Sequence, residues 1–191
     1  SSMDAPLIAL TTLVAYEITE EKKYYKFYKK LIPYLFKSTE NGGYLLHLSE
    51  DAYFPLEYCN ENTTEEDAYF VLNGSLVGYL SLKIINKSYE NNDIKELLEK
   101  IDKGYKMKFP EFIRPSQNWT YYMLNDLTTN QGHYHIFEMK LLNSISKLSS
   151  NCMFKKNFQM NGKLPKEATS YELISLKGDI ETSLFKTKIN N

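Results

Sequence analysis

The chain of 191 residues has little cysteine, little tryptophan and almost no excess of charge of either sign. Its two cysteines, Cys59 and Cys152, cannot make a disulfide framework and lack metal-ligand spacing, so we expect two buried thiols. No apolar run approaches the ~20 residues of a spanning helix, and we expect no transmembrane segment. With 23 basic and 24 acidic side chains the net charge is −1, which argues against binding to nucleic acid or to an anionic membrane surface.

What the chain does contain is an ordinary globular balance, with 42% hydrophobic and 25% charged residues, which excludes wholesale disorder. It is unusually rich in tyrosine, with 16 tyrosines beside 10 phenylalanines. Phenolic hydroxyls must find hydrogen-bond partners or face a cleft, so we expect both. No signal peptide opens the chain and the first methionine is the third residue, from which we expect a fragment of a longer protein.

Pairs of helices recur along the chain. Apolar residues follow helical spacing in three pairs of segments, at residues 7–18 and 24–35, 76–84 and 94–105, and 136–145 and 153–158. The polar breaks inside the pairs begin at Thr19, Asn86 and Ser146, which are 67 and 60 residues apart. Pro33 predicts a kink or an early end in the second helix. Each repeat therefore reads as two antiparallel helices followed by a longer excursion.

Two of the excursions are rich in strand-forming residues. Asn41-Gly42-Gly43 predicts a turn before residues 44–48, and residues 119–124 follow the breaker at 115–118. Helical hairpins with short β-excursions predict a mainly α fold, a partial α/α toroid over residues 1–158 with a peripheral tail at 159–191. Six side chains are expected in its core: Leu10, Val14, Leu80, Leu97, Leu142 and Ile145.

Several segments in register resemble a known family. The segment that runs from Phe70 through Asn73-Gly74 into a helix, the Glu57-Tyr58 pair before it, residues 119–124 and His135-Ile136 are similar to the C-terminal α/α domain of D-glucuronyl C5-epimerases. The similarity covers residues 1–158. It implies an isomerase of polysaccharide biosynthesis that removes the proton beside a uronate carboxylate and returns one to the opposite face of the ring. That reaction needs two acid/base groups and donors for the charge on the carboxylate.

The resemblance assigns roles to individual residues. It implies that Tyr122 is catalytic and that Glu57, Tyr58, Asn73 and His135 bind the substrate in one concave cleft. It implies a polysaccharide partner, neither cofactor nor metal, and a secretory or cell-envelope compartment, and it leaves a homo-oligomer open. A phenol of pKa near ~10 is a poor base at neutral pH, so Tyr122 needs a neighbour that lowers its pKa.

Departures from the family keep other functions open. Asn125 stands where vertebrate-type enzymes have an arginine, and Gly132-His133-Tyr134 replaces their Tyr-His pair. The loss of the arginine favours a non-catalytic carbohydrate-binding or scaffold module on the same fold, whereas the retention of Tyr122 with Glu57-Tyr58 favours an enzyme. A polysaccharide lyase or hydrolase is a third interpretation, although a hydrolase needs a second carboxylate and Glu57 has no evident partner.

Simpler structural roles compete with the functional ones. Tyr121 and Tyr122 alternate across a strand, so one of them can be a packed residue of the hydrophobic core. Asn73 can be a helix cap. His133, His135 and Glu138 could be drawn as a metal site, but they offer only one i, i+3 pair, and a hydrogen-bonding role for His135 is favoured. The lysines of residues 22–30 read as a solvated helix face.

Overall fold

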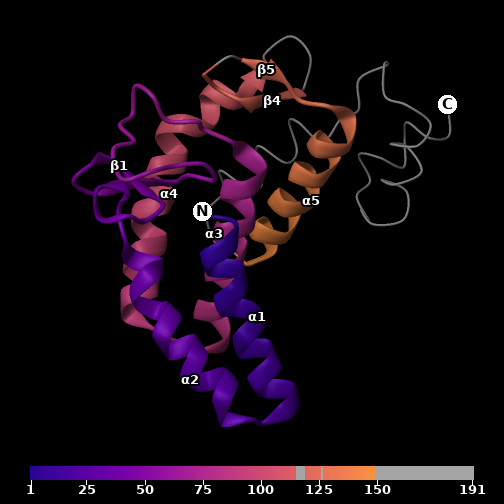
Figure 1. The fold of residues 1–191 in the computed structure, drawn as a ribbon. Helices are drawn as coiled ribbons and strands as arrows, with labels where there is room; N and C mark the ends of the chain where they lie inside the picture. The colour runs from indigo at the N-terminus through magenta and orange to yellow at the C-terminus, as the bar shows by residue number, and fades with distance from the viewer. Residues whose placement is uncertain (115–118, 126, 149–191) are drawn as a thin grey trace, which may run out of the picture. The chain divides into compact units, whose positions relative to one another are not determined.

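The computed structural model describes residues 1–114, 119–125 and 127–148. This part of the chain is mainly helical, with five α-helices and two small antiparallel sheets, which confirms the predicted fold class at that level (Figure 1). The chain divides into two compact units, the first covering residues 1–107 and the second beginning at Lys108.

The first unit opens with a helical hairpin. Helices α1 (Asp4–Thr19) and α2 (Lys22–Leu31) lie side by side, and the chain reverses at Glu20, whose φ of 56° is left-handed (Figure 1). The break predicted after Thr19 is confirmed. Pro33 falls inside a short 3-10 turn, η1 (Ile32–Phe36), because proline cannot continue the α-helical hydrogen bonding. The early end predicted at this proline is confirmed as well.

A β-hairpin follows, as the sequence predicts. After the short turn η2 (Thr39–Asn41), Gly42 takes a φ of 71° and the chain enters strands β1 (Leu45–Ser49) and β2 (Ala52–Pro55). The two strands are antiparallel. Beside the hairpin the Cys59 thiol donates to the carbonyl of Gly43 at 3.3 Å and is half-buried rather than fully buried.

The second helical pair is α3 (Leu72–Ser88) and α4 (Asn92–Phe112). The polar break is shorter than the sequence suggests, since α3 continues past Asn86 to Ser88. Phenols join the two helices. The hydroxyls of Ser75 and Tyr105 lie 2.5 Å apart, and Tyr79 donates to the carboxylate of Asp102. Tyrosine thus supplies both apolar area and polar links inside the helical core.

The predicted core is confirmed in part. Leu97, Leu142 and Ile145 are buried, Leu10 and Leu80 are half-buried, and Val14 is 40% exposed. The prediction for Val14 is wrong because α1 is apolar on nearly every side, and it buries a neighbouring stripe. The buried side chains of that stripe are Pro6, Ala9, Thr12 and Leu13. The parallel stripe at Leu7, Val14 and Ile18 faces outward, and Ile18 is 78% exposed.

The second unit pairs a small sheet with one long helix. Its strands β3 (Ile113–Arg114), β4 (Trp119–Met123) and β5 (Thr128–Thr129) form an antiparallel sheet in that order. Helix α5 (Gly132–Leu148) contacts β4. The predicted strand at 119–124 is therefore confirmed.

Three expectations fall outside the described residues. They concern the last predicted helix at 153–158, the thiol of Cys152 and the boundary near residue 158. Among the described helices, none has the length and apolar content that crossing a membrane requires.

Candidate functional site

The five residues expected to form the site belong to two groups. Glu57, Tyr58 and Asn73 lie in the first unit, and Tyr122 and His135 lie in the second. Within each unit the side chains can be placed against their neighbours. Whether the two groups share one cleft stays a prediction.

Glu57 is held against the first turn of α3. Its Oε2 is buried beside Gly74, and a Cβ on that glycine would overlap the carboxylate. Burial raises the pKa of Glu57, and the nearby charge of Asp4 raises it further. A hydrogen bond from Tyr58 and the backbone N–H of Gly74 act in the opposite direction. The positive end of the helix dipole favours a carboxylate here, so Glu57 is a partly desolvated acid held by a helix start.

Asn73 serves the backbone of the same helix. Its side chain is buried, and Oδ1 accepts a hydrogen bond of 2.7 Å from the N–H of Gly74. That acceptor satisfies one of the N–H groups that a helix start leaves without an intrahelical partner. The N-cap position of α3 is Val71, so Asn73, the second residue of the helix, is not its N-cap, and its contact is local to the first turn.

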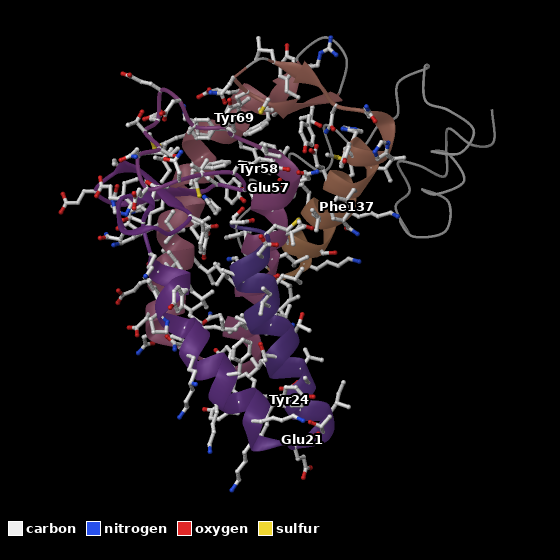
Figure 2. All side chains as sticks on the ribbon, viewed as in Figure 1. Glu21, Tyr24, Glu57, Tyr58, Tyr69 and Phe137 are labelled. Atoms are coloured by element: carbon white, nitrogen blue, oxygen red, sulfur yellow. The ribbon has the colours of Figure 1, made fainter. Side chains whose placement is uncertain are left out.

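Tyr58 lies at the surface beside a second tyrosine. Its backbone forms an isolated bridge with Tyr69, and both rings are 53% exposed (Figure 2). Two exposed aromatic rings next to the Glu57 carboxylate can stack on the apolar face of a sugar. This pairing was not predicted from the sequence, because Tyr69 is eleven residues away along the chain.

A second glycine fixes the segment that precedes Glu57. Gly78 lies one turn after Gly74, on the same face of α3, and a Cβ there would overlap the carbonyl of Ser2. The N–H of Ser2 in turn donates to the carbonyl of Leu56 at 2.8 Å. The close approach of the chain start to α3 thus anchors the residue before Glu57.

In the second unit Tyr122 occupies an irregular position of β4. Tyr121 pairs with Thr129 and Met123 pairs with Thr128, so two steps along β4 match one step along β5. Tyr122 is the extra residue of this β-bulge. Bulges redirect a side chain and occur often beside active sites. The ring of Tyr122 is half-buried and its centroid lies 5.1 Å from that of Tyr134.

Tyr121, the residue before Tyr122 on β4, lies against a cation. The guanidinium of Arg114 lies 5.5 Å from the ring centroid of Tyr121, which is half-buried. Arg114 is the single arginine of the chain. Sequence reasoning missed it, although its uniqueness among 23 basic residues was a usable signal. An arginine is the side chain best suited to binding a carboxylate with two hydrogen bonds.

His135 belongs to a buried polar cluster between β4 and α5. The hydroxyl oxygen of Thr120 lies 3.0 Å from Nδ1 of His135 and 2.6 Å from Oε2 of Glu138, and Asn130 Nδ2 donates to it at 2.9 Å. All four side chains are at most 3% exposed. We refer to these residues as the Thr120 cluster. Sequence reasoning named His135 and Glu138 but missed Thr120 and Asn130.

The environment of Glu138 favours its neutral form. Burial raises the pKa of this carboxyl to about 8, and hydrogen bonds from Thr120 and Asn130 offset only part of that rise. Its Oε1 is buried without a direct hydrogen bond from any described residue. Among the described residues, no group of three or more His, Cys, Asp or Glu is placed to hold a metal ion. Glu138 and His135 are instead joined through the hydroxyl of Thr120.

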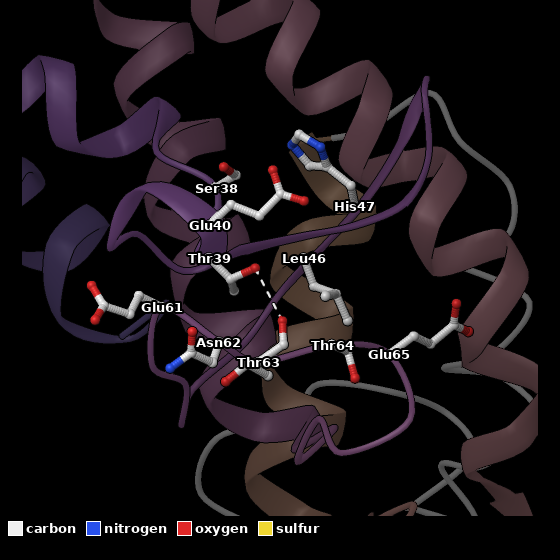
Figure 3. A pocket seen from close by; sticks show the side chains of 10 residues that line it. All are labelled: Ser38, Thr39, Glu40, Leu46, His47, Glu61, Asn62, Thr63, Thr64 and Glu65. Atoms are coloured by element: carbon white, nitrogen blue, oxygen red, sulfur yellow. Dashed lines mark hydrogen bonds between the residues drawn. The ribbon is translucent and has the colours of Figure 1, made fainter.

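A surface pocket of about 370 Å³ lies in the first unit, and none of the five expected site residues lines it (Figure 3). Glu40, Glu61 and Glu65 border it together with several hydroxyl side chains and His47. Its lining holds neither lysine nor arginine. Three carboxylates repel an anion, so this pocket is a poor place for a uronate.

Comparison with known proteins supports the resemblance seen in the sequence. A search of the curated proteins found no match. A family model described as the D-glucuronyl C5-epimerase C-terminus matches residues 1–162, which is most of the chain and includes all five expected site residues. The chain therefore belongs to the D-glucuronyl C5-epimerase C-terminus family.

Proposed function

We propose that this chain forms the α-helical part of a polysaccharide uronate C5-epimerase and that Tyr122 supplies one of its acid/base groups. The observation that carries the proposal is the position of Tyr122 in a chain of this family, on a bulge of β4 beside the Thr120 cluster. A bulged strand next to a buried hydrogen-bond network is a rigid support for a reactive side chain.

The reaction consists of two proton transfers at one carbon. A base removes the hydrogen at C5, the electron pair of that C–H bond moves toward the uronate carboxylate, and an acid on the opposite face returns a proton to C5. Groups that hold the extra charge on the carboxylate lower the barrier. Tyr122 is assigned to one of the two faces, and its chemistry requires a phenol that can give or take a proton.

Arg114 is assigned to the uronate carboxylate. The family's usual arginine is replaced by Asn125, which is exposed at the end of β4. Arg114 comes from the adjacent strand β3, next to Tyr121, and brings a guanidinium to the same sheet.

The proposal includes a shared cleft. Stacked helical hairpins, two of which lie in the described residues, would form a partial α/α toroid that brings Glu57, Tyr58 and Asn73 to the face that carries Tyr122 and His135. The shared cleft can be tested with a uronate tetrasaccharide, which is too short to bridge separate surfaces. Glu57→Gln and His135→Gln should each lower the affinity for the tetrasaccharide about tenfold or more. A loss of affinity in only one of the two variants argues against a shared cleft.

Deuterium incorporation tests the reaction itself. When the protein is incubated with a glucuronate polysaccharide in D₂O, deuterium should appear at C5 of the sugar. Tyr122→Phe removes only the phenolic oxygen, and loss of one acid/base group typically costs ~10²–10⁴-fold in rate. Tyr121→Phe, the neighbour on the same strand, is the matched control and should retain most of the rate. Equal rates of deuterium incorporation in the two variants would show that Tyr122 is not catalytic.

A carbohydrate-binding module without catalysis is the second candidate. The exposed Asn125 at the family's arginine position favours it, because an amide cannot neutralise a carboxylate. This candidate predicts binding of the polysaccharide without deuterium at C5. It further predicts that Arg114→Lys leaves the polymer bound, whereas an epimerase loses rate with the same substitution.

A further inference from the structure

Hydrogen-bond counting at the hydroxyl of Thr120 leads to an inference about His135. A threonine hydroxyl has one hydrogen to donate and two lone pairs to accept with. Three contacts use it, with Asn130 Nδ2, Glu138 Oε2 and His135 Nδ1. The Asn130 amide can only donate. One lone pair is therefore taken, and the remaining lone pair and the single hydrogen are divided between Glu138 and His135.

With a neutral imidazole, and with any carboxyl proton of Glu138 on Oε2, two arrangements satisfy all three contacts. A proton on Oε1 is disfavoured because that buried atom has no hydrogen-bond partner among the described residues. If Glu138 is ionised, the Thr120 hydroxyl donates to its carboxylate, and His135 must then carry a hydrogen on Nδ1 to donate to Thr120. If Glu138 is protonated, its own O–H can donate to Thr120. The hydroxyl then donates to Nδ1, and a neutral His135 carries its hydrogen on Nε2.

We propose that Thr120 and Glu138 are positioning residues that decide which nitrogen of His135 carries the proton, with the Thr120 hydroxyl reversing its direction when Glu138 gains or loses its proton. When Glu138 loses its proton, the hydrogen of the His135 ring moves from Nε2 to Nδ1. The cluster as a whole therefore releases one proton.

The surroundings of Glu138 make the protonated arrangement the resting one. Its pKa is raised by burial to about 8, so the carboxyl is neutral at pH 7. The other ionisable groups on α5 are His133, Tyr134, His135, Lys140 and Lys147. Strand β4, which contacts α5, carries Tyr121 and Tyr122, and the neighbouring strand β3 carries Arg114. None of these is among the groups that shift the pKa of Glu138; besides burial, the contributions from described residues are the hydrogen bonds of Thr120 and Asn130.

The coupling within the cluster does not depend on the proposed function. In the resting arrangement Nε2 of His135 carries the hydrogen and is a hydrogen-bond donor. In the other arrangement Nε2 is an acceptor and can take a proton. The hydroxyl of Thr120 thus selects between two chemical roles for one imidazole.

Nitrogen NMR of the histidine rings tests the coupling without any substrate. In the 191-residue chain labelled with ¹⁵N-histidine, the His135 signals are assigned by their loss in His135→Gln. The expected result is the Nε2–H tautomer at about pH 7 and conversion to the Nδ1–H tautomer with a midpoint near pH 8. A His135 tautomer that does not change between about pH 7 and pH 9.5 overturns the proposal.

Variants separate this coupling from a purely structural role. Glu138→Gln cannot ionise and should abolish the pH dependence, while Thr120→Ser keeps the hydroxyl and should retain it. Thr120→Val removes the hydroxyl at similar volume and should also abolish it. The methyl signals of Ile136 and Met139, which are buried on α5 in the same unit, report whether each variant is folded. If the His135 tautomer still changes with pH in Glu138→Gln, the proposal is overturned. That outcome does not depend on whether the chain is an epimerase.

Discussion

The carboxylate of Glu57 occupies the space that a side chain at Gly74 would take. Gly74 has no left-handed φ, so its backbone conformation is open to any residue and only its missing Cβ matters. The glycine of the Asn73-Gly74 motif is therefore required for space. It allows an acid from a preceding loop to reach the first turn of α3.

Gly74→Ala should move Glu57 without unfolding the first unit. The overlapping atom is the end of a flexible side chain that can swing away, and alanine favours a helix over glycine by up to about 1 kcal/mol. We expect unchanged or slightly raised stability in urea unfolding, together with weaker binding of a uronate tetrasaccharide.

Gly78→Ala is the matched control on the same face. A Cβ there meets the backbone carbonyl of Ser2, which cannot rotate away. We expect destabilisation of about 1–3 kcal/mol, typical of an overpacked site. If the two alanine variants lose equal stability, then Glu57 is held more rigidly than its contact with Gly74 implies.

Alanine substitutions in the two apolar stripes of α1 should lower the free energy of unfolding by different amounts. Leu13→Ala removes a buried side chain and should cost about 2–5 kcal/mol in unfolding free energy. Ile18→Ala changes a side chain that is 78% exposed and should stay within about 0.5 kcal/mol of the parent. A large loss in Ile18→Ala would mean that this outward stripe is covered in solution.

Alkali should unfold the first unit through its buried phenols. Burial raises the pKa of Tyr44 and of Tyr105 well above 10. A raised pKa in the folded state means that the stabilisation is complete below the unfolded-state pKa near ~10 and is lost as pH rises above it. Absorbance titration should therefore show at least two tyrosines, Tyr44 and Tyr105, that ionise only with unfolding.

Tyr44→Phe separates the two effects of that phenol. It removes the 3.0 Å hydrogen bond to the carbonyl of Leu35, at a cost of about 1 kcal/mol at neutral pH. The variant should nevertheless lose less stability than the parent between about pH 9 and pH 11. A parallel decline of both proteins would show that Tyr44 ionises without penalty.

Glu138 should make the second unit less stable as pH rises. Its pKa is about 8 in the folded protein against 4.5 for the free group, so its contribution is complete below about pH 4.5 and is lost as pH rises to 8. The slope is at most about 1.4 kcal/mol per pH unit. Glu138→Gln should lack this decline in thermal unfolding between pH 5 and pH 8. A decline of equal size in the variant would assign it to another group.

Sequence periodicity predicted the helical hairpins but not which stripe of α1 is buried. Leu10 and Val14 belong to one helical row and Leu13 to the next, and both rows are apolar, so spacing alone cannot distinguish them. Helix α1 packs against α2 and α3, and in that packing Leu13 is buried while Val14 is exposed.

The candidate site was predictable only where residues carry recognisable chemistry. Tyr122 and His135 were found because a phenol and an imidazole in a family motif attract notice. Thr120 was not, since a threonine in a strand is ordinary until α5 brings His135 and Glu138 to its hydroxyl. The link between them spans 15 and 18 residues, far beyond any local pattern.

The bulge at Tyr122 also limits how this segment can change in length. Deleting one residue from β4 would restore a regular ladder with β5 but would turn every side chain beyond the deletion to the opposite face. The strand could then keep either its backbone pairing or the direction of Thr120 toward α5, but not both. Homologous chains should therefore exchange residues freely at the outer positions of β4 while conserving the number of residues between Thr120 and His135.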